Sequence, residues 1–162
     1  MFETESLILR ARDPDLDLNF LHQLYNDASY LTNQTSQPLL PRTRNTCGTQ
    51  IGCLNFFNSD FDFNNRVAYV SIGFLRAEDR GKGLGTEVLR WGMEYAFMEL
   101  GLHRVQLECY SFNLGALACY RKVGFIEEGR MRKTYFKTGE WHDTIVMAML
   151  DEEWIELRKW LK

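Results

Sequence analysis

The sequence has few of the residues that mark disulfide-rich or metal-binding proteins. It holds four cysteines and three histidines in 162 residues, and no two cysteines stand in the CxxC spacing of a zinc site. We therefore expect no metal site and no disulfide framework. Reduced cysteines are the rule inside cells, so we predict a cytoplasmic location.

A surplus of positive charge is also absent. The formal net charge is −3, which argues against broad binding to nucleic acid or to an anionic membrane. No stretch approaches the roughly 18 apolar residues of a membrane span, and the acidic start MFETES is unlike a signal peptide. With 45% apolar residues and only three prolines, the composition is that of a globular protein, which we predict to be one domain over residues 1–162.

Apolar periodicity predicts alternating strands and helices. Strands are expected at residues 6–10, 51–57, 66–75 and 103–110, and a hairpin of residues 124–137 and 140–150 with Gly139 in its turn. Helices are expected at residues 13–27, at 86–102, at 114–122 and from Asp151 onward, with Asp151 as its N-cap.

The long helix is expected to end at Gly101, and its buried face to consist of Leu89, Met93, Ala96, Phe97 and Leu100. Residues 29–50 contain two prolines and many polar side chains, and their composition predicts a loop. This order of elements predicts an α/β fold of the α+β type, with a mixed, mostly antiparallel sheet flanked by helices.

The stretch RGKGLG, residues 80–85, places three glycines and two cations between a predicted strand and a predicted helix. It is not a Walker loop, because Lys82 is followed by Gly83 rather than Ser or Thr. It is not a complete GxGxxG motif either, because Thr86 replaces the last glycine and the flanking strands do not clearly form a parallel βαβ unit. Unhindered N–H groups at a helix start still favour an anion, and Arg80 and Lys82 add positive charge. The alternative is a flexible, solvated loop.

A second pattern, NLGALACYRKVGF, covers residues 113–125. Helical spacing places Asn113, Ala116 and Tyr120 along one face. Together the two patterns resemble the GCN5-related N-acetyltransferase (GNAT) superfamily. Its pattern [QR]xxGx[GA] is met by Arg80, Gly83 and Gly85, and its pattern NxxAxxxYxKxGF is met by residues 113–125.

Within that superfamily the chain is similar to the RimJ/RimL-like branch of ribosomal-protein N-terminal-alanine acetyltransferases. The resemblance implies a single GNAT domain with a splayed sheet and a CoA-binding core at about residues 67–150. It also implies acetyl-CoA as donor, a primary amine as acceptor, and no metal. The implied CoA ligands are the strand end Ile72, Gly73, Phe74 and Leu75, the segment Arg80, Gly81, Lys82, Gly83, Leu84, Gly85 and Thr86, and the helix residues Asn113, Ala116, Tyr120 and Lys122.

The resemblance also suggests catalytic roles. Tyr120 matches the general acid of the family by position, whereas Ser71 stands where relatives often carry a glutamate base. Glu108, Asp60 and His142 remain alternative bases. An α-amine with a pKa of about 7.8 is roughly a quarter neutral at pH 7.4, but a lysine-type amine with a pKa of about 10.4 is only about 0.1% neutral. A missing base therefore favours a protein N-terminus or another weakly basic amine.

Residues 29–50 are also too few for the second helix and the strand that relatives carry in the half of the domain that binds the acceptor. One alternative is therefore a catalytically weak or inactive acyl-CoA-binding module. Another is a nucleotide-phosphate protein that uses RGKGLG without acetyl-CoA. The expected partners are acetyl-CoA and a peptide N-terminus or small amine, and a homodimer stays open.

Overall fold

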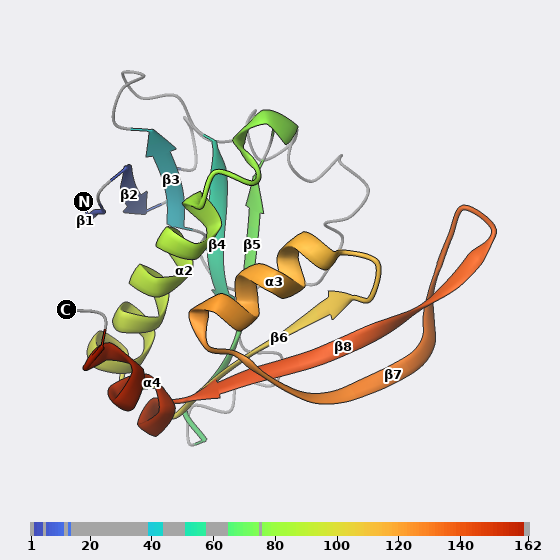
Figure 1. Cartoon of the computed structure of the whole chain (residues 1–162). Helices are drawn as coiled ribbons and strands as arrows, with labels where there is room; N and C mark the ends of the chain where they lie inside the picture. The colour runs from blue at the N-terminus through green and yellow to red at the C-terminus, as the bar shows by residue number, and fades with distance from the viewer. Residues whose placement is uncertain are drawn as a thin grey trace. The chain divides into compact units, whose positions relative to one another are not determined.

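The structure is a computed structural model, and it describes residues 2–4, 6–11, 13, 39–43, 51–57, 65–74 and 76–160 (Figure 1). The chain forms two compact units. The first contains Met1–Phe61 and Val70–Gly92, and the second contains Asp62–Tyr69 and Met93–Lys162. The helix predicted over residues 13–27 lies outside the described residues beyond Asp13.

The described elements are eight strands and five helical segments, of which the strands at residues 2–3 and 39–43 and the helical turn at residues 77–79 were not predicted. The strands are β1 (Phe2–Glu3), β2 (Leu7–Ala11), β3 (Leu39–Thr43), β4 (Gly52–Phe57), β5 (Val67–Phe74), β6 (Arg104–Tyr110), β7 (Ile126–Lys137) and β8 (Glu140–Leu150). The helices are the 3-10 turn η1 (Ala77–Asp79), α2 (Leu84–Glu94), the π-helical turn η2 (Tyr95–Glu99), α3 (Leu114–Val123) and α4 (Asp151–Arg158).

In the first unit, β1, β2, β3 and β4 pair in sequence order as antiparallel neighbours. Leu7 and Leu9 of β2 are fully buried while Ile8 between them is half-buried, which is the alternation that predicted this strand. Helix α2 packs closely on β4. A side-chain carbon on Gly92 of α2 would lie 2.8 Å from the Leu54 side chain of β4, which is closer than two side-chain carbons normally pack. The carboxylate of Glu87 binds the N-terminal turn through the Thr4 hydroxyl and the Ser6 N–H.

Strand β3 corrects the prediction of a continuous loop over residues 29–50. It pairs with β2 over five residue pairs, from Leu7↔Thr43 to Ala11↔Leu39, and Leu39 also pairs with Leu54 of β4. Composition predicted a loop because prolines and polar residues disfavour strands locally. Hydrogen bonding to neighbouring strands outweighs that local preference.

In the second unit, β6 pairs with β5 and β8, and β8 also pairs with β7. The β5–β6 ladder is parallel over three residue pairs, Val67↔Arg104 to Tyr69↔Gln106. A parallel βαβ connection, which the flanking residues did not clearly indicate, is therefore present, and it runs through α2. The other described pairs are antiparallel, which confirms the mixed, mostly antiparallel α+β fold.

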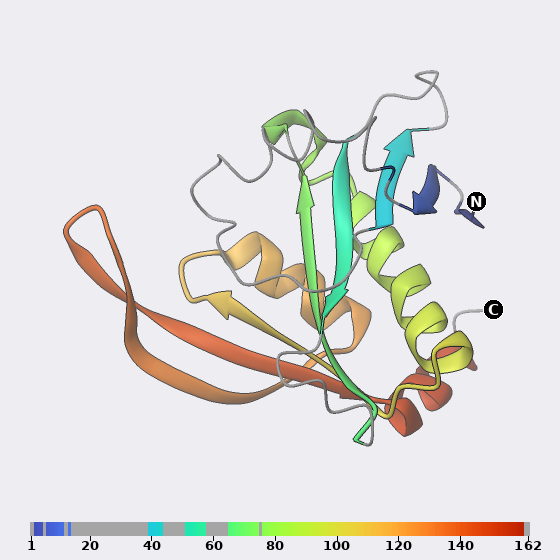
Figure 2. The same cartoon turned by 180° about the vertical axis from the view of Figure 1, so that it is seen from behind.

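The long β7–β8 hairpin turns at Thr138 and Gly139, as predicted. Both residues have positive φ, 49° and 86°, as a tight two-residue turn requires. The hairpin extends beyond β6 and α3 in Figure 1. Helix α3 lies over one face of these strands, and Figure 2 shows the opposite side.

The long helix ends as predicted at Gly101, whose φ is 62°. Its last turn is widened into the π-helical turn η2, and Leu100, predicted as core, is 48% exposed because it follows that turn. Asp151 is not the N-cap of α4 but its first residue. Instead, the carboxylate of Glu153 accepts the N–H of Leu150 at 2.8 Å.

Candidate functional site

The predicted site residues fall into two groups, one in each unit. The first unit contains Ser71 to Phe74 and the glycine segment Arg80 to Thr86, and the second contains Glu108, Asn113, Ala116, Tyr120 and Lys122. Leu75 lies outside the described residues. Each group is described here within its own unit.

The backbone conformation of the glycine segment suits the binding of an anion. Gly81 and Gly83 have φ values of 75° and 85°, which are comfortable only for glycine, and a side chain at either would meet nothing within 4 Å. The carbonyl of Gly83 accepts the N–H of Glu87 at 3.1 Å, so α2 starts directly after it. The first N–H groups of a helix have no acceptor within the helix and attract negative charge. The segment therefore fits a phosphate or pyrophosphate group.

The two cationic side chains of this segment, Arg80 and Lys82, both contact other groups of the first unit. Arg80 is exposed, and its Nη2 donates to the carbonyl of Phe74 at 3.2 Å, which fastens the segment to the end of β5. The Nζ of Lys82 lies 3.9 Å from Oδ1 of Asp79. Asp79 is buried, and its Oδ2 has no hydrogen-bond partner within the described part of the chain. Lys82 therefore offsets a buried negative charge as well as adding positive potential at the helix start.

The strand before the segment runs very close to its neighbour. A side-chain carbon on Gly52 would lie 2.2 Å from the carbonyl oxygen of Gly73, so only glycine allows β4 and β5 to approach in this way. Ile72, Gly73 and Phe74 are half-buried. Their backbone is the strand end that the resemblance implied as a ligand of CoA.

Ser71 is held by Asn55, a residue that no sequence motif indicated. The amide Nδ2 of Asn55 donates to the Ser71 hydroxyl at 3.2 Å. Asn55 is fully buried in β4, and its Oδ1 has no partner among the described residues. Neither an amide nor a hydroxyl accepts a proton at neutral pH, so this pair contains no general base. A polar residue within the apolar stretch IGCLNFF is the signal that could have pointed to Asn55.

Helix α3 begins as predicted. Asn113 is its N-cap, and the side-chain Oδ1 accepts the N–H of Ala116 at 3.3 Å. The carbonyl of that side chain is therefore engaged in capping, and the residue is exposed. Lys122 is exposed near the end of the helix, and Gly124 ends it with a φ of 119°.

Tyr120 is buried on α3, with 9% of its surface exposed. Its ring meets Phe125 edge to face at 6.0 Å between centroids. Burial, together with the thiols of Cys109 and Cys119, raises the pKa of Tyr120 above its ordinary value. The phenol is therefore protonated at all physiological pH values, which is the state a general acid requires.

The candidate bases of the second unit come from β6 and β8. Alternation along β6 places Val105, Leu107 and Cys109 in the core beneath α3, and Glu108 exposed on the other face. Glu108 is opposite Val146 of β8. His142 is half-buried, and its ring meets that of Phe112 edge to face, with the two centroids 4.8 Å apart. Asp60 lies outside the described residues, and those that are described hold no cluster able to bind a metal ion.

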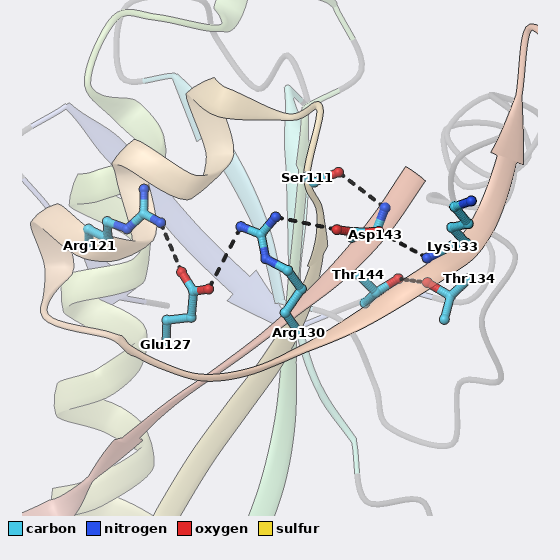
Figure 3. Close-up of polar contacts among 8 residues, drawn as sticks. All are labelled: Ser111, Arg121, Glu127, Arg130, Lys133, Thr134, Asp143 and Thr144. Carbon is cyan, nitrogen blue, oxygen red and sulfur yellow. Dashed lines mark hydrogen bonds and ion pairs between the residues drawn. The ribbon is translucent and has the colours of Figure 1, made fainter. Parts of the chain in front are cut away.

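A polar network joins α3 to the hairpin (Figure 3). Glu127 accepts from Arg121 of α3 at 3.1 Å and lies 3.9 Å from Arg130, and Arg130 donates to Asp143 at 3.3 Å. The other carboxylate oxygen of Asp143 accepts the Lys133 N–H at 2.9 Å. These contacts lower the pKa of Asp143, chiefly through the Lys133 N–H and Arg130. Ser111, two residues before Asn113, also binds the backbone N–H of Asp143, so the network holds the start of α3.

A glycine-rich strand-to-helix junction and a buried, protonated tyrosine on a capped helix are the parts expected of an acetyltransferase fold. The family model described as the acetyltransferase (GNAT) family matches residues 7–125, which include both groups of residues. The chain belongs to this family. Among the described residues, no helix has the length and apolarity needed to span a membrane.

Three curated relatives have names that refer to N-acetylation. YjcK of Bacillus subtilis, an N-acetyltransferase by name, is 40% identical over 80 residues, which are 49% of this chain and 44% of YjcK. YdaF of the same organism, whose name contains the words ribosomal N-acetyltransferase, is 33% identical over 66% of this chain and 57% of its own length. The spermidine N(1)-acetyltransferase of Escherichia coli K12 is 32% identical over 52% of this chain and 46% of its own length. The chain spans about half the length of the curated relatives it matches.

Solved structures share the fold. The spermidine N-acetyltransferase of Vibrio cholerae in complex with CoA and spermine has a TM-score of 0.78, with 93% of this chain and 98% of that chain covered. Its sequence identity is 22%, so the likeness concerns the fold. It confirms the predicted GNAT fold.

Proposed function

We propose that this protein is an acetyl-CoA-dependent N-acetyltransferase that moves an acetyl group directly to a primary amine. The observation that carries this proposal is the family match over residues 7–125, which spans both RGKGLG and the Asn113 to Phe125 helix. A nucleotide-phosphate protein would need only the first of these features.

In this proposal the glycine segment binds the donor. The N–H groups at the start of α2 receive the pyrophosphate, and the left-handed Gly81 and Gly83 let it approach the backbone. The exposed Lys82 adds counter-charge. The half-buried edge from Ile72 to Phe74 pairs with the amide-containing arm of the donor, as the resemblance implied.

The chemical step needs a neutral amine and a proton donor. The amine nitrogen forms a bond to the acetyl carbonyl carbon, the carbon–sulfur bond breaks, the nitrogen loses a proton and the departing thiolate gains one. Tyr120 is the residue that we propose to protonate the sulfur, because burial keeps its phenol protonated. A well-placed acid contributes about 10²- to 10⁴-fold to a rate.

The side chains of Asn55 and Ser71 indicate which kind of acceptor amine can react. Since Asn55 and Ser71 are neutral, they cannot deprotonate an ammonium group, and the acceptor must arrive largely as the neutral amine. This supports a peptide α-amine, or a small amine whose pKa is lowered by a neighbouring charge. The names of the relatives support small amines such as spermidine more often than ribosomal proteins, so the RimJ/RimL branch is the weaker part of the proposal.

Several other expectations stay predictions. These are the single domain over residues 1–162, the CoA-binding core at about residues 67–150, the cytoplasmic location and the homodimer. The shortened acceptor half over residues 29–50 also stays a prediction, because most of that region lies outside the described residues.

Calorimetry followed by acceptor screening tests the function. Acetyl-CoA should bind, and a panel of peptides with free N-termini and of small amines should release CoA thiol in an acceptor-dependent way. Binding of acetyl-CoA without such release would contradict the enzyme and favour the acyl-CoA-binding module. Absence of acetyl-CoA binding would overturn both.

A further inference from the structure

The Asn55 amide and the Ser71 hydroxyl form a short chain of hydrogen-bond donors within the first unit. The Nδ2 of Asn55 contacts the Oγ of Ser71 at 3.2 Å and the Sγ of Cys53 at 3.6 Å. An amide nitrogen can only donate, so Ser71 is the acceptor in its bond with Asn55. A hydroxyl that accepts a hydrogen bond still has its own hydrogen to donate.

The Ser71 hydrogen is not donated to Asn55. The Oδ1 of Asn55 is buried and accepts no hydrogen bond from the residues that the structure describes. Among those residues the contact of the Ser71 side chain is the one with the Asn55 nitrogen, in which Ser71 accepts. Because Ser71 is half-buried rather than enclosed, its hydrogen is available to a bound molecule.

The surroundings of this pair make the Ser71 hydroxyl a strong and fixed donor. Asn55 is fully buried in β4, so water does not compete for its amide. A hydroxyl that accepts a hydrogen bond becomes a better donor, and a low local dielectric constant strengthens both bonds. The close approach of β4 and β5 at Gly52 and Gly73 holds the two strands in register. The pair therefore suits a group that develops negative charge on an oxygen.

We propose that the Ser71 hydroxyl donates a hydrogen bond to the carbonyl oxygen of the acetyl group, and that Asn55 is the positioning residue that orients and polarises this hydroxyl. The inference rests on the proposed function. Ser71 directly precedes the half-buried strand end Ile72–Phe74, and the glycine segment follows that strand end in the same unit. An arm that runs from the glycine segment along Phe74, Gly73 and Ile72 brings its acetyl end toward Ser71.

The donor acts on electrons and transfers no proton. When the amine nitrogen bonds to the carbonyl carbon, one electron pair of the C=O bond moves onto the oxygen, where the Ser71 hydrogen stabilises it. The C=O bond forms again as the carbon–sulfur bond breaks. The hydrogen stays on Ser71 throughout, so this role needs no base. One donor aimed at such an oxygen contributes about 10²- to 10³-fold to kcat.

Removal of the hydroxyl tests the proposal. Ser71→Ala should lower kcat about 100-fold and leave the Kd for acetyl-CoA close to the native value, and Ser71→Thr should restore most of kcat because it keeps the hydroxyl. Thr144→Val is the matched control, because it removes another hydroxyl from the sheet, one that is buried and bonded to Thr134 at 2.7 Å in the second unit. Its kcat should stay native. Equal losses in Ser71→Ala and Thr144→Val would overturn the proposal.

The pH dependence separates a hydrogen-bond donor from a base. Because Ser71 keeps its hydrogen, Ser71→Ala should lower kcat by the same factor from about pH 6 to about pH 9. Asn55→Asp keeps the shape of the side chain but accepts the Ser71 hydrogen and turns it away from the acetyl group, so kcat should fall about tenfold or more. A loss in Ser71→Ala that changes with pH, or a native kcat in Asn55→Asp, would contradict the proposal.

Infrared spectra of bound acetyl-CoA, labelled with carbon-13 at the thioester carbonyl, test the inference without an acceptor. A hydrogen bond lowers the stretching frequency of a carbonyl group, so the frequency should be lower in the native protein and in Thr144→Val than in Ser71→Ala. If this difference is found but no amine is acetylated, the donor role stands and the proposed function fails. If amines are acetylated but the native and Ser71→Ala frequencies are equal, the donor role fails.

Discussion

The glycine segment and the α3 region perform their proposed tasks with different parts of the chain. The segment from Arg80 to Thr86 acts through its backbone, with two left-handed glycines and the start of a helix. The α3 region acts through side chains, with a buried Tyr120 and a charged network that reaches the hairpin. A backbone site depends on local conformation, whereas a side-chain site depends on what packs around it.

The largest effect should come from the side-chain region. Tyr120→Phe keeps the ring against Phe125 but removes the proton donor, so kcat should fall about 100-fold or more. Steady-state release of CoA thiol measures this loss. The KM for acetyl-CoA should stay close to that of the native protein, because the glycine segment is untouched. An unchanged kcat in a correctly folded variant would remove Tyr120 from the mechanism.

The backbone region should respond to a single methyl group. Gly83→Ala forces a residue with a side chain into a φ of 85°, which costs about 1–2 kcal/mol, so the Kd for acetyl-CoA should rise about 5- to 30-fold. Calorimetry measures the change. Gly115→Ala is the matched control, because Gly115 lies in α3 at an ordinary φ with open space around it, and its Kd should not change. Equal losses in both variants would contradict a backbone site at Gly83.

The smallest effect concerns alkaline stability of the side-chain region. Burial raises the pKa of the Cys109 thiol from 9.0 to about 11, with Arg121 opposing the shift. The unfolded chain then loses this proton at lower pH than the folded chain, so the free energy of unfolding should fall as the pH rises from about 9 to about 11. The contribution is fully present below pH 9.

Urea unfolding at pH 8 and pH 10.5 measures this effect. Cys109→Ala should lose less stability between the two pH values than the native protein. Cys119→Ala is the matched control, because Cys119 is a thiol of the same unit that is only half-buried, and this variant should keep the native pH dependence. A native-like pH dependence in Cys109→Ala would assign the alkaline loss to other groups, such as Tyr120, whose pKa is also raised by burial.

The sequence predicted the features that depend on near neighbours. Asn113 caps α3 and Gly139 lies in a two-residue turn, because each acts on backbone groups within a few residues. The glycines at 81 and 83 pointed to an anion site for the same reason. The prediction was wrong at β3, because pairing with neighbouring strands, and not composition, makes residues 39–43 a strand. It was also wrong at the start of α4, where the Glu153 carboxylate accepts the N–H of Leu150 and Asp151 is not the N-cap.

What the sequence determined by itself is therefore the family, the order of the elements from β4 onward and the position of both motifs, since these depend on local spacing. Only the tertiary structure placed the Asn55 amide on Ser71, the Tyr120 phenol in the core and the Tyr135 and His142 rings beside Phe112. Such contacts join residues far apart along the chain, and they arise when strands and helices are packed together. Burial then sets which side chains keep a proton and which can receive a charge.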